Sequence, residues 1–172
     1  MLLKEQPLLA KEYDELQIRH LLKEIVSAFN KSDVEQLLSF HSDDVILMDP
    51  GIPLIQGKKR IREMFAGFQK RQLAIQLNYD IHELEVDNNW AFVRGSVAKT
   101  SRIQSGIPLK EDYRFICLFK KQNNECWLRT HVIVNSNKPM VLNNDQPEVQ
   151  LNKFYELYND WDGTGREHIH HS

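Results

Sequence analysis

Four long segments rich in β-branched and aromatic residues follow one another in the second half of this chain. They cover residues 72–86, 89–104, 108–121 and 125–136. The stretches between them, DNN, QSG and QNN, have the residue types of tight turns. We therefore expect four consecutive strands, each antiparallel to the one before it.

The part of the chain ahead of these strands has helical periodicity. Apolar residues recur every three or four positions from Tyr13 to Asn30 and again from Gly57 to about Lys70. Between these segments, NKSDVEQLLSF restarts a helix, and residues 45–48 (VILM) are typical of a short strand. The order helix, helix, strand, helix and four-strand meander predicts an α+β domain with helices packed on one face of a curved sheet.

The end of the chain is set apart from this domain. We expect residues 1–139 to form the α+β domain and residues 140–172 to form a linker and an amphipathic helix with a frayed end. The apolar stripe of that helix consists of Leu151, Phe154, Tyr155, Tyr158 and Trp161. It would pack on the body or on a second subunit, or alternatively act as a lid over a ligand.

Composition excludes several classes of partner. The net charge of −2 gives no electrostatic reason to expect nucleic acid or an anionic membrane surface. No apolar stretch approaches the ~20 residues of a membrane span. The first residues carry Lys4, Glu5 and Pro7 where a signal peptide needs an unbroken apolar run, so we expect a cytoplasmic protein. Cys117 and Cys126 would not face each other across a hairpin, and both are predicted to be free thiols.

Strand alternation and turn lengths assign side chains to the two faces of the sheet. A three-residue turn in the last hairpin places Arg129 opposite Cys117, and a two-residue turn at residues 105–106 places Arg94 there too. Large aromatic side chains and a few polar groups then converge, as in a small-molecule pocket. The predicted pocket face consists of Phe92, Arg94, Ser96, Glu111, Tyr113, Phe115, Trp127, Arg129, His131, Ile133 and Asn135.

The opposite face of the sheet is also apolar in this assignment. It carries Val97, Ile116, Leu118, Val132 and Val134. An uncovered sheet face is normally polar. We therefore expect a cover, most simply a second subunit in a homodimer.

Several stretches of the sequence resemble one known superfamily. IRHLLKEIVSAFNKSDVEQLLSFHSDDVILMDPG, QGKKRIREMF, NNWAFVRGSV, KEDYRFICLFKK and CWLRTHVIVNSNKP are similar to the nuclear-transport-factor-2-like superfamily, most closely its SnoaL-like and ketosteroid-isomerase-like branch. The resemblance covers roughly residues 14–139. It implies a cone-shaped α+β half-barrel, usually dimeric, with a pocket between the helices and the concave sheet.

The resemblance also implies roles for individual residues. Asp49, in MDPG, falls where ketosteroid isomerases have their general-base aspartate. Glu111 falls near the carboxylic acid that helps to hold the oxyanion, although Asp112 is one step away and could take that position. The tyrosine of that oxyanion hole is missing, because Ile25 stands in its place.

Asp49 has two interpretations from the residues around it. An aspartate before Pro50 and Gly51 is ordinary turn chemistry. A carboxylate at the end of an apolar strand is also partly desolvated, which raises its pKa and suits it to removing a proton from carbon next to a carbonyl. Glu111, Tyr113 or His131 could then donate a hydrogen bond to the enolate oxygen.

The remaining candidates have equally open interpretations. A buried Arg94 needs an anion, either Glu111 or Asp49 within the protein or the carboxylate of a substrate. His131 is either a satisfied core histidine or an acid–base group. The predicted ligand-binding residues are Arg94, Tyr113, Phe115, Trp127 and Asn135.

We therefore expect a cofactor-independent protein that binds a hydrophobic small molecule. One alternative is an isomerase, cyclase or dehydratase that uses Asp49, Glu111 and His131. The other is a non-catalytic ligand-binding or dimerisation module. The terminal EHIHH has metal-ligand residue types without a second cluster to close a site, so no metal is expected.

Overall fold

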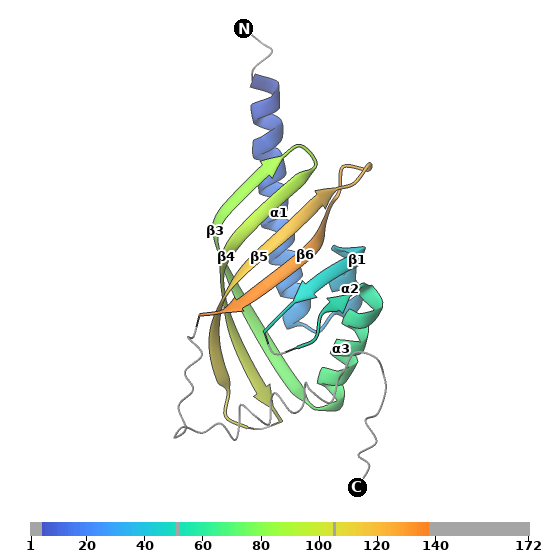
Figure 1. Ribbon diagram of the computed structural model, residues 1–172, viewed down its shortest axis with the longest axis vertical. Coiled ribbons are helices and arrows are strands. Elements are labelled where there is room, and N and C mark those ends of the chain that lie inside the picture. The colour runs from blue at the N-terminus through green and yellow to red at the C-terminus, as the bar shows by residue number, and fades with distance from the viewer. Residues whose placement is uncertain (1–4, 51, 105, 138–172) are drawn as a thin grey trace.

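The computed structural model describes residues 5–50, 52–104 and 106–137, with side chains from residue 9 onward. Figure 1 shows helices covering one side of a curved sheet. The expected linker and helix at 140–172, with the stripe from Leu151 to Trp161, lie outside the described residues. The division of the chain at residue 139 therefore stays a prediction.

The elements follow the predicted order. The helices are α1 (Glu5–Asn30), α2 (Val34–Ser39) and α3 (Lys58–Lys70). The strands are β1 (His41–Met48), β2 (Ile55–Gln56), β3 (Leu73–Asp87), β4 (Trp90–Ile103), β5 (Leu109–Lys121) and β6 (Trp127–Ser136). They form one six-stranded sheet in the order β2-β1-β6-β5-β4-β3, in which only the β1–β6 pair is parallel. The predicted α+β class and the four-strand meander are confirmed.

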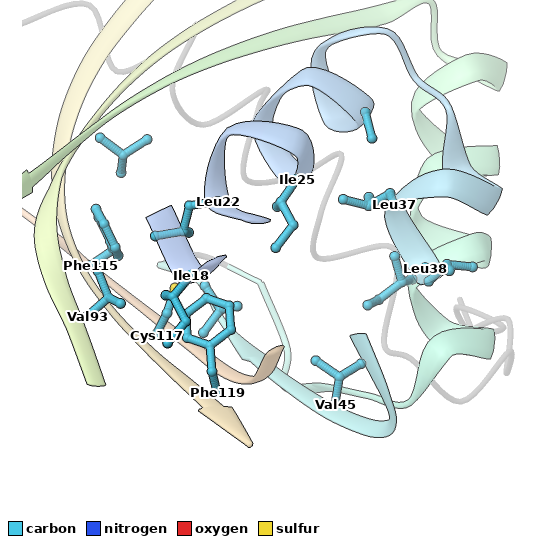
Figure 2. Close-up of a cluster of buried hydrophobic side chains, with 14 of the residues drawn as sticks. Ile18, Leu22, Ile25, Leu37, Leu38, Val45, Val93, Phe115, Cys117 and Phe119 are labelled. Carbon is cyan, nitrogen blue, oxygen red and sulfur yellow. The ribbon is translucent and has the colours of Figure 1, made fainter. Parts of the chain in front are cut away.

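The core lies between α1 and the concave face of the sheet. Ile18, Leu22 and Ile25 recur at helical spacing on α1, and none is more than 2% exposed. They point toward Phe115, Phe119 and other side chains of the sheet, as Figure 2 shows. Each such side chain contributes about 1.5–3 kcal/mol when fully buried. The sheet face under α1 is therefore the face that can hold a site.

A glycine on β4 lets two aromatic rings meet across the sheet. A Cβ on Gly95 would collide with the backbone oxygen of Asp80 and lie 2.8 Å from the Phe115 ring. Because that space is empty, the Phe115 ring crosses β4 and stacks on Tyr79 of β3, with centroids 4.6 Å apart. Gly95 thereby positions the Tyr79 side chain on the concave face.

A β-bulge in β6 reverses the predicted faces of half that strand. Phe119 pairs with Arg129 and Leu118 pairs with His131, which leaves Thr130 as an extra residue. Side chains before the bulge keep the predicted alternation, so Trp127 and Arg129 are buried. After the bulge the alternation is shifted by one residue. The prediction was wrong there: Val132 and Val134 face the concave side, and His131, Ile133 and Asn135 face outward.

The register between β4 and β5 also differs from the prediction by one residue. The predicted two-residue turn is a longer loop, because the last pair is Ser101 with Leu109. Val93 therefore pairs with Cys117, and Gly95 pairs with Phe115. A one-residue shift moves every side chain to the other face. Phe92, Arg94 and Ser96 consequently face outward, whereas Val97 and Lys99 face the concave side.

Candidate functional site

A cavity of about 90 Å³ lies between the helices and the concave face of the sheet. Its walls are mainly apolar and aromatic, with Phe29 from α1, Phe65 and Phe68 from α3, and Tyr79 and Tyr113 from the sheet. The polar or charged side chains in its lining, besides these tyrosines, are His41, Asp49, Lys99 and Arg129. The cavity has the position that the resemblance implied.

Asp49 combines both interpretations suggested by its sequence. It follows β1, and its carbonyl oxygen accepts a hydrogen bond from the Ile52 N–H at 3.4 Å, as in a turn. The same residue lines the cavity. Burial raises the pKa of the Asp49 carboxyl, Lys99 opposes that rise, and the negative charge of Glu111 adds to it. The turn thus carries a carboxyl group that is partly withdrawn from water.

Lys99 and Glu111 form a charged pair beside Asp49. They face each other across β4 and β5, with 3.8 Å between Lys99 Nζ and Glu111 Oε2. Their side chains are only 11% and 13% exposed. Lys99 Nζ also lies 5.3 Å from the centre of the Tyr113 ring. One lysine therefore acts on two carboxyl groups at this end of the site.

Tyr79 supplies a second hydroxyl group to the cavity, besides that of Tyr113. Burial is the main reason that its pKa rises to about 12, so the phenol keeps its proton at neutral pH. The charges of both Arg129 and Asp49 act on this hydroxyl. Tyr79 therefore lies within electrostatic reach of the two charged parts of the cavity. Tyr79 was not among the predicted site residues, because the turn lengths assigned no face to residues 72–86.

Arg129 and His41 form the other charged part of the cavity. The Arg129 N–H donates to the Phe40 carbonyl at 2.9 Å, which sets His41 opposite Arg129 in the β1–β6 pair. The His41 Nδ1–H donates to the Leu37 carbonyl at 2.7 Å. Arg129 Nε and Nη2 both donate to His41 Nε2, at 3.0 and 2.6 Å. Sequence reasoning placed Arg129 correctly but had no signal for His41.

The structure brings only some of the predicted site residues together. Asp49 and Tyr113 line the cavity, and Glu111 lies beside them on β5. Phe115 is buried behind Tyr79. Trp127 is buried as well, but its indole N–H donates to Asp14 Oδ1 at 3.1 Å, outside the cavity lining. Asp49, Glu111 and Tyr113 thus remain the predicted candidates near the cavity.

Three predicted residues lie away from the cavity. Arg94 is half-exposed on the outer face, where its Nε donates to Glu83 Oε2 at 2.7 Å. His131 is on the same face, and its Nδ1 lies 3.0 Å from Thr130 Oγ1. Asn135 is exposed. The register shift displaced Arg94, and the bulge displaced His131 and Asn135.

Other sequence predictions concern isolated groups. Cys117 is buried and Cys126 is exposed, and both are free, as predicted. Burial raises the pKa of the Cys117 thiol, so this buried group is unreactive. Within residues 5–137, no helix has the length and apolar character needed to cross a bilayer. The terminal histidines of EHIHH lie outside the described residues.

Comparison with known proteins supports the family suggested by the sequence. The SnoaL-like domain family matches residues 22–126, which is more than half of the chain. No match was found among curated proteins.

Solved structures share the fold. A ketosteroid isomerase-like protein from Erwinia carotovora atroseptica is 23% identical, with a TM-score of 0.65 over 73% of this chain and 98% of its own. A proposed dehydratase of the nuclear-transport-factor-2-like family from Streptomyces avermitilis is 16% identical, with a TM-score of 0.66 over 74% and 99%. A protein of the same superfamily from Salmonella enterica serovar Typhimurium is 17% identical, with a TM-score of 0.64 over 77% and 96%. The chain belongs to the SnoaL-like family, and it shares the fold of these solved structures.

Proposed function

We propose that this protein binds a small carbonyl compound in the cavity and removes a proton from the carbon next to its carbonyl group, with Asp49 as the general base. The observation that carries this proposal is the Asp49 carboxyl on the wall of an apolar cavity, beside Lys99. A carboxylate with a raised pKa is a stronger base than one in water. Lys99 keeps that carboxylate available in its ionised form.

The cavity also has groups that could hold the enolate. When Asp49 takes the proton, the electron pair of the C–H bond forms the enolate and the charge moves to oxygen. The Tyr79 hydroxyl, protonated at neutral pH, can donate a hydrogen bond to that oxygen. Tyr79 would then do the work of the tyrosine that Ile25 replaces. Asp49 returns its proton to a carbon of the same ligand, so no co-reactant is needed.

Glu111 and Tyr113 have supporting roles in this proposal. Glu111 lies 3.8 Å from Lys99 Nζ, and the Tyr113 ring lies below the same ammonium group. Both contacts restrict where the lysine charge can be. We therefore assign Glu111 and Tyr113 the role of positioning Lys99. In this proposal neither residue donates a hydrogen bond to the enolate oxygen.

The size of the cavity limits the ligand. An apolar cavity of about 150 Å³ binds benzene in another protein, and pockets for drug-sized ligands usually start near ~300 Å³. The cavity here is about 90 Å³. The proposed ligand is therefore a short-chain carbonyl compound, far smaller than a steroid.

Proton abstraction can be tested before the product is known. Short ketones and oxo acids are incubated with the protein in D₂O, and exchange of the α-hydrogens is followed by NMR. The parent is expected to accelerate exchange for at least one compound, and Asp49→Asn is expected to abolish the acceleration. Asp44→Asn, at an exposed position on β1, the strand that Asp49 follows, serves as the matched control. Equal exchange rates for the parent and Asp49→Asn would remove Asp49 as the base.

A second candidate function is ligand binding without catalysis. The observation in its favour is that aromatic side chains already fill much of the space between α1, α3 and the sheet. In that case a carbonyl compound would raise the melting temperature of both the parent and Asp49→Asn. Neither protein would accelerate exchange of the α-hydrogens of that compound.

We also propose a homodimer formed through the outer face of the sheet. After the register corrections this face still has an apolar patch, and its members Met48, Trp90 and Ile133 are 41%, 42% and 37% exposed. The full patch consists of Met48, Trp90, Phe92, Ile116, Leu118 and Ile133.

Sedimentation equilibrium tests this dimer. The parent should be a dimer and Ile133→Glu a monomer. The control Asn78→Glu, on the edge strand β3, should remain a dimer. A monomeric parent would contradict the proposal. The cytoplasmic location stays a prediction.

A further inference from the structure

We propose that Arg129, held by His41, is the binding site for a carboxylate group of the ligand, so that the cavity accepts a short oxo-carboxylic acid. That the ligand has an oxo group follows only if the proposed function above is right. That the site binds a carboxylate is inferred from Arg129 and His41 alone. The Arg129 guanidinium carries a positive charge that is buried and has no anion paired with it among the described residues.

Arg129 is a buried cation with unused hydrogen-bonding capacity. The residue is 6% exposed and lines the cavity. The edge of the guanidinium formed by Nε and Nη2 donates to His41 Nε2. The opposite terminal nitrogen, Nη1, is buried and has no hydrogen-bond partner among the described residues. Nη1 thus keeps hydrogen-bonding capacity that no described residue uses.

His41 holds the guanidinium without neutralising its charge. Because the Leu37 carbonyl can only accept a hydrogen bond, the proton of the ring is on Nδ1 and Nε2 is a bare acceptor. Burial and the neighbouring Arg129 charge lower the pKa of His41 well below its usual value, which keeps the ring neutral. His41 therefore orients Arg129 but supplies no negative charge.

No other described residue supplies the missing charge. Asp49 interacts with Lys99 and Glu111, and Asp14 pairs with Lys121 at 3.0 Å. Within residues 9–137, no carboxylate oxygen forms an ion pair with Arg129. Arg129 opposes the burial-driven rise of the Tyr79 and Cys117 pKa values through its charge and through side-chain hydrogen bonding, but Nη1 itself has no hydrogen-bond partner among the described residues. Both groups are neutral.

The chemistry of the free edge selects a carboxylate. A buried charge without a counter-ion is strongly unfavourable, so an anion that enters the cavity recovers that energy. The planar edge of a guanidinium matches the two oxygens of a carboxylate in a bidentate pair. A planar carboxylate is also a better fit than a bulkier phosphate in a cavity of about 90 Å³.

The position of Arg129 relative to Asp49 limits the distance between the two functional groups of the ligand. His41 pairs with Arg129 at one end of β1, and Met48, which precedes Asp49, pairs with Ile133 at the other end. Arg129 and Ile133 are four positions apart on β6, which is at most roughly 13 Å of strand because the bulge at Thr130 shortens this stretch. The long arginine side chain shortens that distance inside the cavity, and Tyr79 responds to both charges. An acid with its oxo group a few carbons from the carboxylate fits this arrangement.

The test compares acids with their uncharged amides. 4-Oxopentanoate and 5-oxohexanoate, whose oxo groups lie a few carbons from the carboxylate, are each titrated against the parent alongside the corresponding amide, by calorimetry and by thermal shift. At least one acid is expected to bind on the order of tenfold to a hundredfold more tightly than its amide, the range expected for hydrogen bonds to a charged group. If no acid binds better than its amide, the proposal is wrong.

Variants separate this site from the proposed catalytic base. Arg129→Met should abolish the preference for the acid, and Arg129→Lys should keep only part of it because the lysine lacks the planar edge. Asp49→Asn should keep the full preference even if α-hydrogen exchange is lost. Acetate, titrated at constant ionic strength, should raise the melting temperature of the parent and leave folded Arg129→Met unchanged. An undiminished acid preference in Arg129→Met would overturn the assignment.

Discussion

Two buried cations face the same cavity in different surroundings. Lys99 lies 3.8 Å from the Glu111 carboxylate and acts on Asp49 as well. Arg129 is held by the neutral His41 and lies beside the neutral Tyr79 and Cys117, with one terminal nitrogen unpaired among the described residues. The protein therefore compensates one buried charge internally and leaves the other for a ligand. The same kind of substitution should accordingly change the free energy of unfolding strongly at Lys99 and only slightly at Arg129.

The largest effect is expected from Lys99→Met. This change leaves Asp49 and Glu111 close together without their shared cation, and removal of one partner from a buried charge cluster typically costs about 3–5 kcal/mol. The free energy of unfolding, measured in urea at pH 7, should fall by about that amount. Lys110→Met, at an exposed position on β5, is the matched control. A loss below about 1 kcal/mol would mean that the two carboxyl groups do not depend on Lys99.

The next effect concerns the pH dependence of stability. The pKa of His41 is lowered in the folded state and returns to its usual value, near 6.5, on unfolding. The unfolded state then binds the extra proton, so the contribution of His41 is complete above pH 6.5 and is lost as the pH falls below it. When one extra proton binds to the unfolded state, the free energy of unfolding changes by at most about 1.4 kcal/mol per pH unit.

Urea titrations between pH 7.5 and 5 measure this slope. His41→Gln should flatten it, because glutamine can still accept from Arg129 but does not titrate. His82→Gln, which changes a more exposed histidine on the outer face, should leave the slope as in the parent. A slope that persists in His41→Gln would show that His41 is not the group responsible. Asp49 acts in the opposite sense at lower pH, because burial raises its pKa from 3.8.

A smaller effect is expected from Arg129→Met in the absence of ligand. The change removes a buried charge without a counter-ion, which favours the folded state, but it also leaves His41 Nε2 without its donor. These terms oppose each other, so the free energy of unfolding should change by no more than about 1 kcal/mol. A loss of 3 kcal/mol or more would show that Arg129 has an internal counter-ion, and would make it resemble Lys99.

The α+β fold could be predicted because its signals are local. Turn residues separate the strands, helical periodicity precedes them, and the Asp-Pro-Gly turn follows an apolar strand. Each signal depends on only a few neighbouring residues. The position of the cavity and the place of Asp49 on its wall were implied by the resemblance to the SnoaL-like family, and Asp49 does line the cavity.

The contents of the cavity could not be predicted, because a shift of one residue exchanges the faces of a strand. The bulge at Thr130 moved His131 and Asn135 outward and brought Val132 inward. The longer loop between β4 and β5 placed Arg94 outside and Lys99 inside. The buried arginine is therefore Arg129, whereas Arg94 is half-exposed and paired with Glu83.

The smallest effect is therefore expected at Arg94, which tests that correction. Its ion pair with Glu83 is half-exposed on the outer face, where such pairs contribute between about 0.2 and 1 kcal/mol. Arg94→Gln should lower the free energy of unfolding by no more than this, and the loss should shrink further in 0.5 M salt because exposed charges are screened. Binding of oxo acids should be unchanged, in contrast to Arg129→Met. If Arg94→Gln instead abolished the preference for an acid over its amide, the register observed here between β4 and β5 would have to be wrong.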